Sequence, residues 1–305
     1  MTCEHTKALN LMKDTSHTPT DLAYRLYRDA YGRSLGQRVF HIIPIVMATS
    51  LVKLAFLRHR FKMINEITFL DIVKNRPAYK PLITISNHYS CLDDLILFGQ
   101  ALPYKLLLDA DRLRWTLAAV DICFVNKLYS VFFASGKGIP VWRRVRDPET
   151  GNILLPGLGV CQPSMEFCLD LLNAGHWIHL FSQGRVILPH ERNNETNIRL
   201  RWGVGRLLAE ASVDPVVLPI WHCGIDEMSP CKEPYVRHTL SRLLGPRISV
   251  TALVGAPFEV GDLVRKSIDT GTNLYSRLTA SVQRALYQLK PIAEAEHAKH
   301  KASLY

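Results

Sequence analysis

A histidine and an aspartate five positions apart are the residues of this 305-residue chain with the clearest chemical potential. His88 and Asp93 lie in the stretch ITISNHYSCLDDLILFG, which spans residues 83–99. A histidine beside a carboxylate can take a proton from a hydroxyl group, because the carboxylate fixes the ring tautomer and stabilises the imidazolium. The pair therefore indicates general-base chemistry on a hydroxyl nucleophile.

The spacing restricts where the two side chains can meet. On one regular helix, five steps of about 100° place them about 140° apart, so we expect His88 in a turn and Asp93 in the first turn of the helix that follows. Ser90-x-x-Asp93 is typical of a capping box and predicts a helix start at Ser90, with Asn87 and Asp94 as supporting residues. A simpler interpretation stays open, in which Asp93 only caps the helix, His88 is an ordinary loop histidine and Asp94 is a surface charge.

Short apolar runs alternate with helix-length segments from residue 80 onward. This alternation predicts an α/β fold with a mixed central β-sheet flanked by helices. Two segments rich in turn-forming and polar residues, 147–159 and 188–197, are predicted to be surface loops. The expected strands are 82–86, 139–142, 177–181, 216–221 and 249–254, and the expected helices are 91–101, 127–135, 165–174, 202–211 and 272–290.

The longest apolar run covers residues 39–52 and is shorter than the roughly 20 residues that a membrane-spanning helix needs. Four cationic or ionisable residues follow it between Arg58 and Lys62, which favours a helix lying in one leaflet with its cations among lipid phosphates. A buried core helix with a solvated basic end is the alternative. The predicted organisation is an N-terminal helical, partly disordered segment (1–34), an interfacial membrane-anchor helix with a basic flank (35–62), a main domain (63–290) and a polar C-terminal tail (291–305).

Composition narrows the class of partner. Lys and Arg number 37 against 27 Asp and Glu, a net charge of +10, and 48% of residues are hydrophobic. A chain that is both basic and apolar, with a mean hydropathy of +0.03, favours a lipid surface over nucleic acid. Neither zinc-finger spacing nor an aromatic RNA-binding block nor a long Lys/Arg run is present.

Two other motifs carry less weight. His176 and His179 lie on a predicted strand, where positions i and i+3 face opposite sides, so we expect no metal site there. Residues 32–36 match the G-x-S-x-G pattern of a hydrolase nucleophile, but the pattern upstream is that of an amphipathic helix rather than the strand such a nucleophile requires.

The motif Asn87-His88-x-Ser90-x-x-Asp93-Asp94 resembles the first motif of the H-x4-D glycerolipid acyltransferases, and in particular that of the tafazzin family of phospholipid–lysophospholipid transacylases. Further blocks resemble that family in the same order, so that the resemblance covers about residues 40–290. These blocks are WTLAAVDICF (115–124), FFASGK (132–137), WGVGRLLAE (202–210) and LPIWHCG (218–224).

The resemblance implies a glycerolipid acyltransferase fold in the domain 63–290 and a role for each member of the pair. His88 would be the general base on the free hydroxyl of a lysophospholipid, and Asp93 would orient its ring. The resemblance also implies acyl transfer between phospholipids without coenzyme A or another cofactor, remodelling of cardiolipin, and a peripheral, monotopic place on a mitochondrial membrane facing the intermembrane space.

The segment GKGIPVWRR resembles the second acyltransferase block. The backbone of Gly136, Lys137 and Gly138 would approach a phosphate or a developing oxyanion, and Arg143 or Arg144 would bind phosphate in a bidentate manner. An ordinary β-turn with a solvated basic end is the alternative.

The segment FSQGR departs from the third block, where the family reads Phe-Pro-Glu-Gly followed by a basic or small residue. Gln183, with Gly184 and Arg185, is expected to contact substrate, but Gln183 removes a negative charge while keeping an acceptor oxygen. If the charge matters, activity falls, and Gln183→Glu is predicted to raise turnover. Because Gln183 replaces the family glutamate, a catalytically weakened membrane-binding scaffold stays open as one alternative. The other alternative is an acyl-CoA-dependent acyltransferase acting on a lysophospholipid or glycerophosphate.

Overall fold

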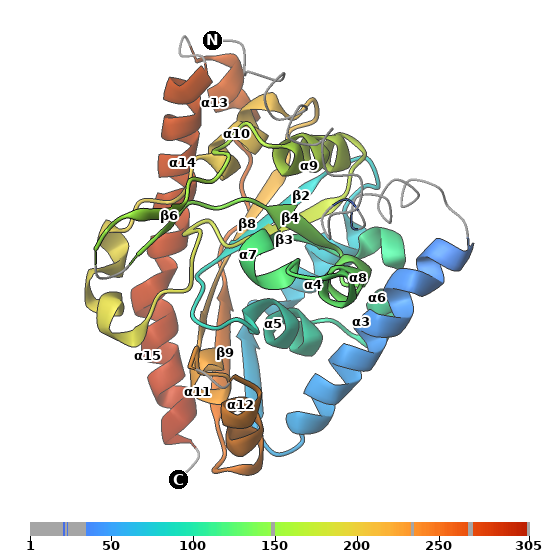
Figure 1. The fold of residues 1–305 in the computed structure, drawn as a ribbon, viewed down its shortest axis with the longest axis vertical. Coiled ribbons are helices and arrows are strands. Elements are labelled where there is room, and N and C mark those ends of the chain that lie inside the picture. The colour runs from blue at the N-terminus through green and yellow to red at the C-terminus, as the bar shows by residue number, and fades with distance from the viewer. Residues whose placement is uncertain are drawn as a thin grey trace.

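A seven-stranded sheet forms the centre of the computed structural model, which describes residues 35–147, 150–232, 235–267 and 271–303 together with Asp21 and Ala23. Its strand order is β1-β9-β8-β2-β7-β3-β4 (Figure 1). All neighbours pair in parallel except β8 and β9. The strands are β1 (Arg60–Ile64), β2 (Leu82–Ser86), β3 (Trp115–Ala119), β4 (Gly138–Val141), β7 (Trp177–Leu180), β8 (Val216–Cys223) and β9 (Ser249–Val254), and β5 (Val145–Arg146) pairs with β6 (Ile153–Leu155) outside the sheet.

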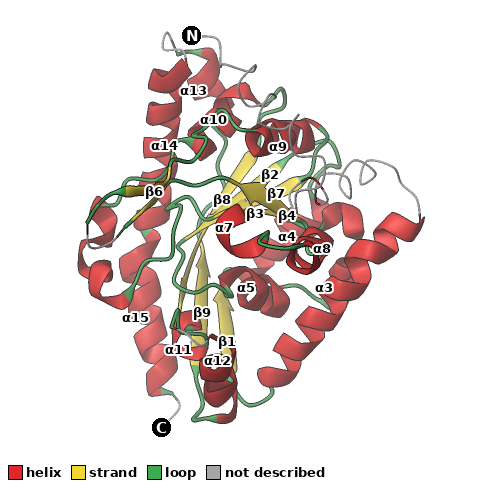
Figure 2. Cartoon of the chain, viewed as in Figure 1, coloured by secondary structure: helices red, strands yellow, loops and turns green. Residues whose placement is uncertain are grey.

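Helices cover both faces of this sheet (Figure 2), which confirms the predicted mixed α/β fold. Apart from Asp21 and Ala23, the predicted segment 1–34, including most of the G-x-S-x-G match, lies outside the described residues. The helices are α3 (Leu35–Ala55), α4 (Glu66–Asn75), α5 (Asp93–Ala101), α6 (Tyr104–Leu107), α7 (Val120–Cys123), α8 (Lys127–Ser135), α9 (Pro163–Asn173), α10 (Gly203–Glu210), α11 (Ile225–Met228), α12 (Tyr235–Leu244), α13 (Gly261–Arg265), α14 (Gly271–Tyr287) and α15 (Leu289–Ala302), with 3-10 turns at Ala110–Arg112 and Pro189–Asn197.

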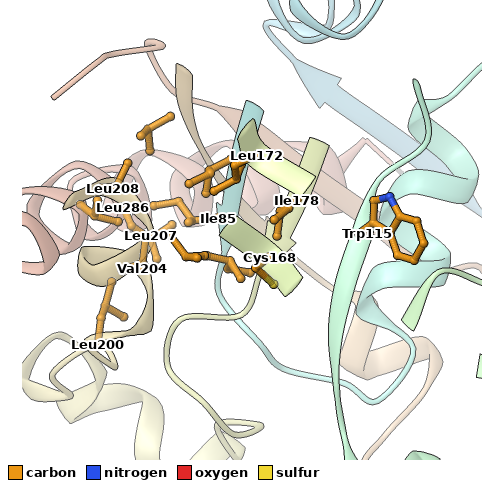
Figure 3. Packing of buried hydrophobic residues seen from close by; sticks show 14 of the residues in the cluster. Ile85, Trp115, Cys168, Leu172, Ile178, Leu200, Val204, Leu207, Leu208 and Leu286 are labelled. Atoms are coloured by element: carbon orange, nitrogen blue, oxygen red, sulfur yellow. The ribbon is translucent and has the colours of Figure 1, made fainter. Parts of the chain in front are cut away.

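Strand β2 shows why the sheet needs helices on both sides. Every residue of β2 is buried, as expected of a central parallel strand. Ile83 and Ile85 belong to one apolar cluster, together with side chains of α9, α10 and α14 such as Leu172, Leu207 and Leu286 (Figure 3). Leu82 belongs to a second cluster on the other face, with side chains of α4 and α5. The alternation of side chains along the strand thus divides the core into two layers.

Helix α3 is shorter than the predicted anchor and is followed by a strand. It ends at Ala55, and Arg60–Ile64 forms the edge strand β1, paired with β9. Part of the predicted basic flank therefore lies in the sheet, and its cations have protein partners: Arg58 donates to the carbonyl of Gly245 at 3.0 Å, and Lys62 lies 3.4 Å from Glu296. Register with β9 places Arg60 and Lys62 in the sheet, whereas Arg58 lies in the turn before it; the number of cations in the sequence does not reveal this pairing.

The predicted polar C-terminal tail is helical as far as Ala302. Residues 291–302 belong to α15, which packs against β8 and β9, and Ala293 is buried. Pro291 lies in the first turn of α15, where a helix needs no backbone donor, so proline does not interrupt it. The predicted polar tail is therefore a helix of the main domain.

The buried His179 of β7 generates a prediction about acid stability. Its Nδ1 lies 2.9 Å from the Thr84 hydroxyl, and burial lowers the pKa of His179 to about 3. Below pH 6.5 the unfolded chain binds a proton that the folded chain does not, so the free energy of unfolding should fall between pH 6.5 and 3 by up to about 1.4 kcal/mol per pH unit from this group. Urea unfolding of the wild type and of His179→Gln at pH 6.5 and 4.5 measures this slope, and equal slopes would contradict the prediction.

Candidate active site

His88 lies in the turn after β2, near the centre of the sheet. The neighbouring strand β7 runs parallel to β2 and is followed by residues 181–183, so both loops leave the sheet at the same edge. The ring of Phe181 stacks on the ring of His88 with centroids 4.1 Å apart. Ligand and catalytic groups collect at the carboxyl ends of parallel strands, and this edge is that position.

The predicted pair of His88 and Asp93 is formed. Nδ1 of His88 lies 2.9 Å from Oδ2 of Asp93, and the same oxygen accepts the backbone N–H groups of Tyr89 at 2.6 Å and Ser90 at 2.9 Å. Because an ionised carboxylate only accepts hydrogen bonds, Nδ1 carries the proton and Nε2 is left as the basic nitrogen. Asp93 is fully buried, whereas the His88 side chain is 19% exposed. This geometry is that of a general base with an orienting carboxylate.

Helix α5 begins at Asp93, three residues after the predicted start at Ser90. The Asp93 carboxylate closes the turn by accepting the N–H of Ser90, the bond that a capping box predicts for this pair, and also the N–H of Tyr89. The Ser90 hydroxyl accepts the N–H of Leu92 at 3.2 Å and donates to the carbonyl of Ser229 at 2.6 Å. Ser90 thus supports the turn by tying it to the segment after α11.

Asn87 ties the histidine turn to the end of β8. Its side chain donates to the carbonyl of His222 and accepts from the N–H of His222, both at 2.9 Å. His222 is fully buried, and its Nε2 lies 2.9 Å from the Asn87 carbonyl and 3.6 Å from Oδ2 of Asp93. His222 lies in the block LPIWHCG, which resembles the family, but its sequence position alone assigns it no role. Its place beside the pair depends on the β2–β8 pairing.

Gln183 is joined to the backbone of the histidine. Its Oε1 accepts the His88 N–H at 2.9 Å, and its Nε2 donates to Glu195. Glu195 is fully buried in the 3-10 turn of Pro189–Asn197, a segment predicted to be a surface loop. The polar run around Glu195 gives no sign of burial, so sequence reasoning missed this residue.

Residues 70–223 match the family model described as acyltransferase. The chain is 35% identical over 259 residues to tafazzin of Drosophila melanogaster, covering 84% of this chain and 61% of the fly protein. It is 37% identical over 217 residues to N-acylphosphatidylethanolamine synthase of Arabidopsis thaliana (70% and 69%), and 28% identical over 227 residues to tafazzin of Saccharomyces cerevisiae (67% and 58%).

The chain belongs to the tafazzin and glycerolipid acyltransferase family. It spans about 60% of the length of the fly and yeast tafazzins, 61% and 58%. The stretch that matches the family model contains the His88–Asp93 pair, Gln183 and His222, and it ends with β8.

The residues of the second acyltransferase block lie at opposite ends of β4: Gly136, Lys137 and Gly138 at its start, and Arg143 and Arg144 after its end. Through the pairings β4–β3, β3–β7 and β7–β2, Gly138 is in register with Thr84 of β2. His88 comes four residues after Thr84, beyond the carboxyl end of that strand. The turn of Gly136, Lys137 and Gly138 therefore enters β4 from the opposite edge of the sheet. The Lys137 ammonium is buried there against the carbonyls of Ala110 and Leu113, and burial lowers the pKa of Lys137 to about 7. These three residues are not brought together with His88, because the direction of β4 places its start away from the site.

The three predicted arginines do follow the carboxyl ends of their strands. Arg143, after β4, forms a bidentate pair with Asp121 of α7, with Nη2 and Oδ2 2.7 Å apart. Arg185, after β7, forms a bidentate pair with Glu191 at 2.6 and 2.7 Å. Arg144 donates to the carbonyl of Pro156 and, within the described part of the chain, has no carboxylate partner. Gly184 precedes Arg185 with a φ of +76°, a conformation that favours glycine.

Asp94 has a structural partner rather than a place beside His88. Arg114 binds its carboxylate in a bidentate manner, with Nε 2.8 Å from Oδ1, and the Thr116 hydroxyl donates to it at 2.8 Å. Burial opposes ionisation, but Arg114 outweighs it and keeps the pKa of Asp94 below its usual value. The residue is therefore not a free surface charge; it joins α5 to β3. Among the described residues, no group of three or more His, Cys, Asp or Glu side chains could hold a metal ion.

This pairing predicts that Asp94→Asn lowers stability, because the change leaves the Arg114 guanidinium, 7% exposed, without its counter-charge. We expect the free energy of unfolding to fall by about 2 kcal/mol. Asp262→Asn is the matched control, because its pair with Arg265 is exposed and should change stability by less than about 0.5 kcal/mol. Urea unfolding near pH 7 distinguishes the two, and equal losses would contradict a structural role for Asp94.

Proposed function

We propose that this protein transfers a fatty acyl chain from a phospholipid to a lysophospholipid, with His88 as the general base. The observation that carries the proposal is the His88–Asp93 pair, whose partly exposed ring offers Nε2 to a substrate while Nδ1 is held by the carboxylate. Membership of the tafazzin and glycerolipid acyltransferase family supports the class of reaction.

The proposed reaction needs one base and no covalent enzyme intermediate. The lysophospholipid hydroxyl gives its proton to Nε2 of His88 while its oxygen attacks the ester carbonyl carbon of the donor. Asp93 stabilises the imidazolium that forms. The bond between that carbon and the donor glycerol oxygen then breaks, and Nε2 returns the proton to the leaving oxygen. The products are a new phospholipid and a lysophospholipid.

An exposed apolar surface supports a lipid substrate. Helix α3 packs along α5, α6 and α8 and turns a stripe of apolar side chains outward, with Met47 64% and Leu51 68% exposed. By length and composition Arg38–Ala55 could also cross a membrane. Its contacts along the domain instead favour a helix that lies flat on the lipid. We call the exposed apolar side chains of α3 and of the α7–α8 region the apolar face; they are Val39, Ile43, Met47, Leu51, Leu54, Ile122, Val125, Leu128, Val131 and Phe132.

The apolar face extends to the edge of the sheet that carries His88. Helix α7 follows the carboxyl end of β3, and α8 comes next in the chain and contacts both α7 and α3. A membrane bound by this face would thus lie beside the loops that hold the catalytic pair. We propose on this basis a monotopic association with membranes and, from the family resemblance, remodelling of cardiolipin at a mitochondrial membrane.

The proposed reaction is tested with purified protein, a phospholipid labelled in its acyl chain and an unlabelled lysophospholipid, with and without coenzyme A. We expect transfer in both conditions, and a loss of roughly 100-fold or more in His88→Ala because the base is removed. His190→Ala, which changes an exposed histidine, is the control and should keep full activity. A requirement for acyl-CoA, or transfer that survives the loss of His88, would reject the proposal.

A second acceptor is favoured by one specific observation. A relative 37% identical to this chain is named N-acylphosphatidylethanolamine synthase, and its product carries the acyl group on nitrogen. The same base can take a proton from an amine as from a hydroxyl. Adding phosphatidylethanolamine to the assay distinguishes the two acceptors. If the label appears in N-acylphosphatidylethanolamine and not in phospholipid formed from the lysophospholipid, the amine is the acceptor.

The apolar face predicts how membrane binding fails. In Met47→Glu/Leu51→Glu two large exposed apolar side chains become charged, so binding to vesicles of phosphatidylcholine and cardiolipin should weaken by at least about tenfold. The control is Ile292→Glu, which changes an apolar residue 55% exposed on α15, away from α3 in Figure 1. Vesicle co-sedimentation measures both, and equal binding by the two variants would show that the apolar face does not contact lipid.

A further inference from the structure

Glu195 is a buried carboxylate with three donors. Its oxygens accept from the Tyr89 hydroxyl at 2.6 Å, from Nε2 of Gln183 and from the ammonium of Lys290 at 3.2 Å. The Glu195 side chain is 0% exposed and that of Lys290 only 12%. A buried charge persists in a fold only where it is paired and hydrogen-bonded, and this one is both. The family resemblance predicted nothing for this residue.

The carboxylate determines which way the Gln183 amide faces. Because Glu195 accepts and cannot donate, the amide must turn its NH2 toward Glu195, and its oxygen then faces the N–H of His88, 2.9 Å away. In the reverse orientation two donors would meet at His88 and two acceptors at Glu195. One buried charge thus fixes the hydrogen bond that holds the backbone of the catalytic histidine.

Glu195 is joined to the histidine turn a second time, through the hydroxyl of Tyr89. Burial, with Glu195 as the next cause, raises the pKa of Tyr89, so its hydroxyl stays a donor. The backbone N–H of Tyr89 donates to Asp93 at 2.6 Å, while its hydroxyl donates to Glu195. The histidine turn is therefore held by one carboxylate on each side.

We infer that Glu195 is a positioning residue of the proposed acyl transfer and that it supplies, from position 195, the negative charge that the third block lacks at Gln183. Through its hydrogen bonds with Gln183 and Tyr89, Glu195 fixes the position of His88. The inference rests on the proposed function for its catalytic consequence, whereas the pairing of Gln183 with Glu195 is a property of the fold.

The pairing reverses the expectation that Gln183→Glu raises turnover. A glutamate at position 183 would face the Glu195 carboxylate, and two adjacent buried carboxylates cannot both ionise without repulsion. The single change should therefore lower turnover. Exchange of the two groups, in Gln183→Glu/Glu195→Gln, keeps one carboxylate and one amide and should restore it.

The experiment compares the wild type, Gln183→Glu, Glu195→Gln and the double exchange in the labelled-phospholipid assay. We expect each single variant to lose at least about tenfold in kcat, with the KM for lysophospholipid within about twofold, because the base is misplaced rather than the substrate site altered. The double exchange should return to within about threefold of the wild type. Glu259→Gln is the matched control, since Glu259 pairs with Lys80 at 2.7 Å outside the site, and should keep full activity.

Thermal unfolding of the same four proteins separates this inference from the proposed function. Each single variant should lower Tm by at least about 3 °C, and the double exchange should recover most of the loss. Additive losses in Tm and no recovery of kcat would overturn the inference. A wild type without transfer activity, but with recovery of Tm in the double exchange, would reject the proposed function while keeping the pairing. Recovery of Tm without recovery of kcat would leave Glu195 a purely structural residue and overturn its positioning role.

Discussion

The proposed site depends on one carboxylate oxygen. Oδ2 of Asp93 accepts two backbone N–H groups of the histidine turn and the ring N–H of His88, so a single group shapes the loop and selects the tautomer. Asp93 also begins α5, where the free backbone donors and the dipole of a helix favour negative charge. The same carboxylate therefore shapes the turn after β2, lies at the start of a helix and orients the base. Loss of this charge would affect the fold of the turn and its chemistry together.

Strand direction decides which residues can join this pair. The segments after β2, β3, β4 and β7 leave the sheet at one edge because these strands are parallel. These segments carry His88, Asp121, Arg143 and Gln183. The turn before β4 enters from the other edge and is excluded, although its sequence resembles a family block. Residues of a family motif can therefore join the site only when they follow the carboxyl end of a strand, and the turn before β4 does not.

Local patterns predicted the features that depend on neighbours in the chain. Buried apolar runs indicated β2, β7, β8 and β9, and the spacing of His88 and Asp93 required a turn between them. The features that escaped depend on distant partners: β1 needs its register with β9, and α15 needs the surface of β8 and β9. Lys290 and Glu195 are 95 residues apart, and neither segment is apolar, so their burial together follows only from the folded chain.

The charge opposite the histidine backbone illustrates how a site can keep its electrostatics while a motif changes. An acceptor oxygen at position 183 suffices for the His88 N–H, and an amide provides it as well as a carboxylate does. The amide also has donors, which a carboxylate lacks, and Glu195 takes one of them. The negative charge then lies on Glu195, which contacts Gln183 rather than the His88 backbone and pairs with Lys290 of α15. A glutamine in the third block is therefore compatible with an intact base when a buried carboxylate accepts a hydrogen bond from its amide. Such a glutamine indicates a weakened site only where that carboxylate is absent.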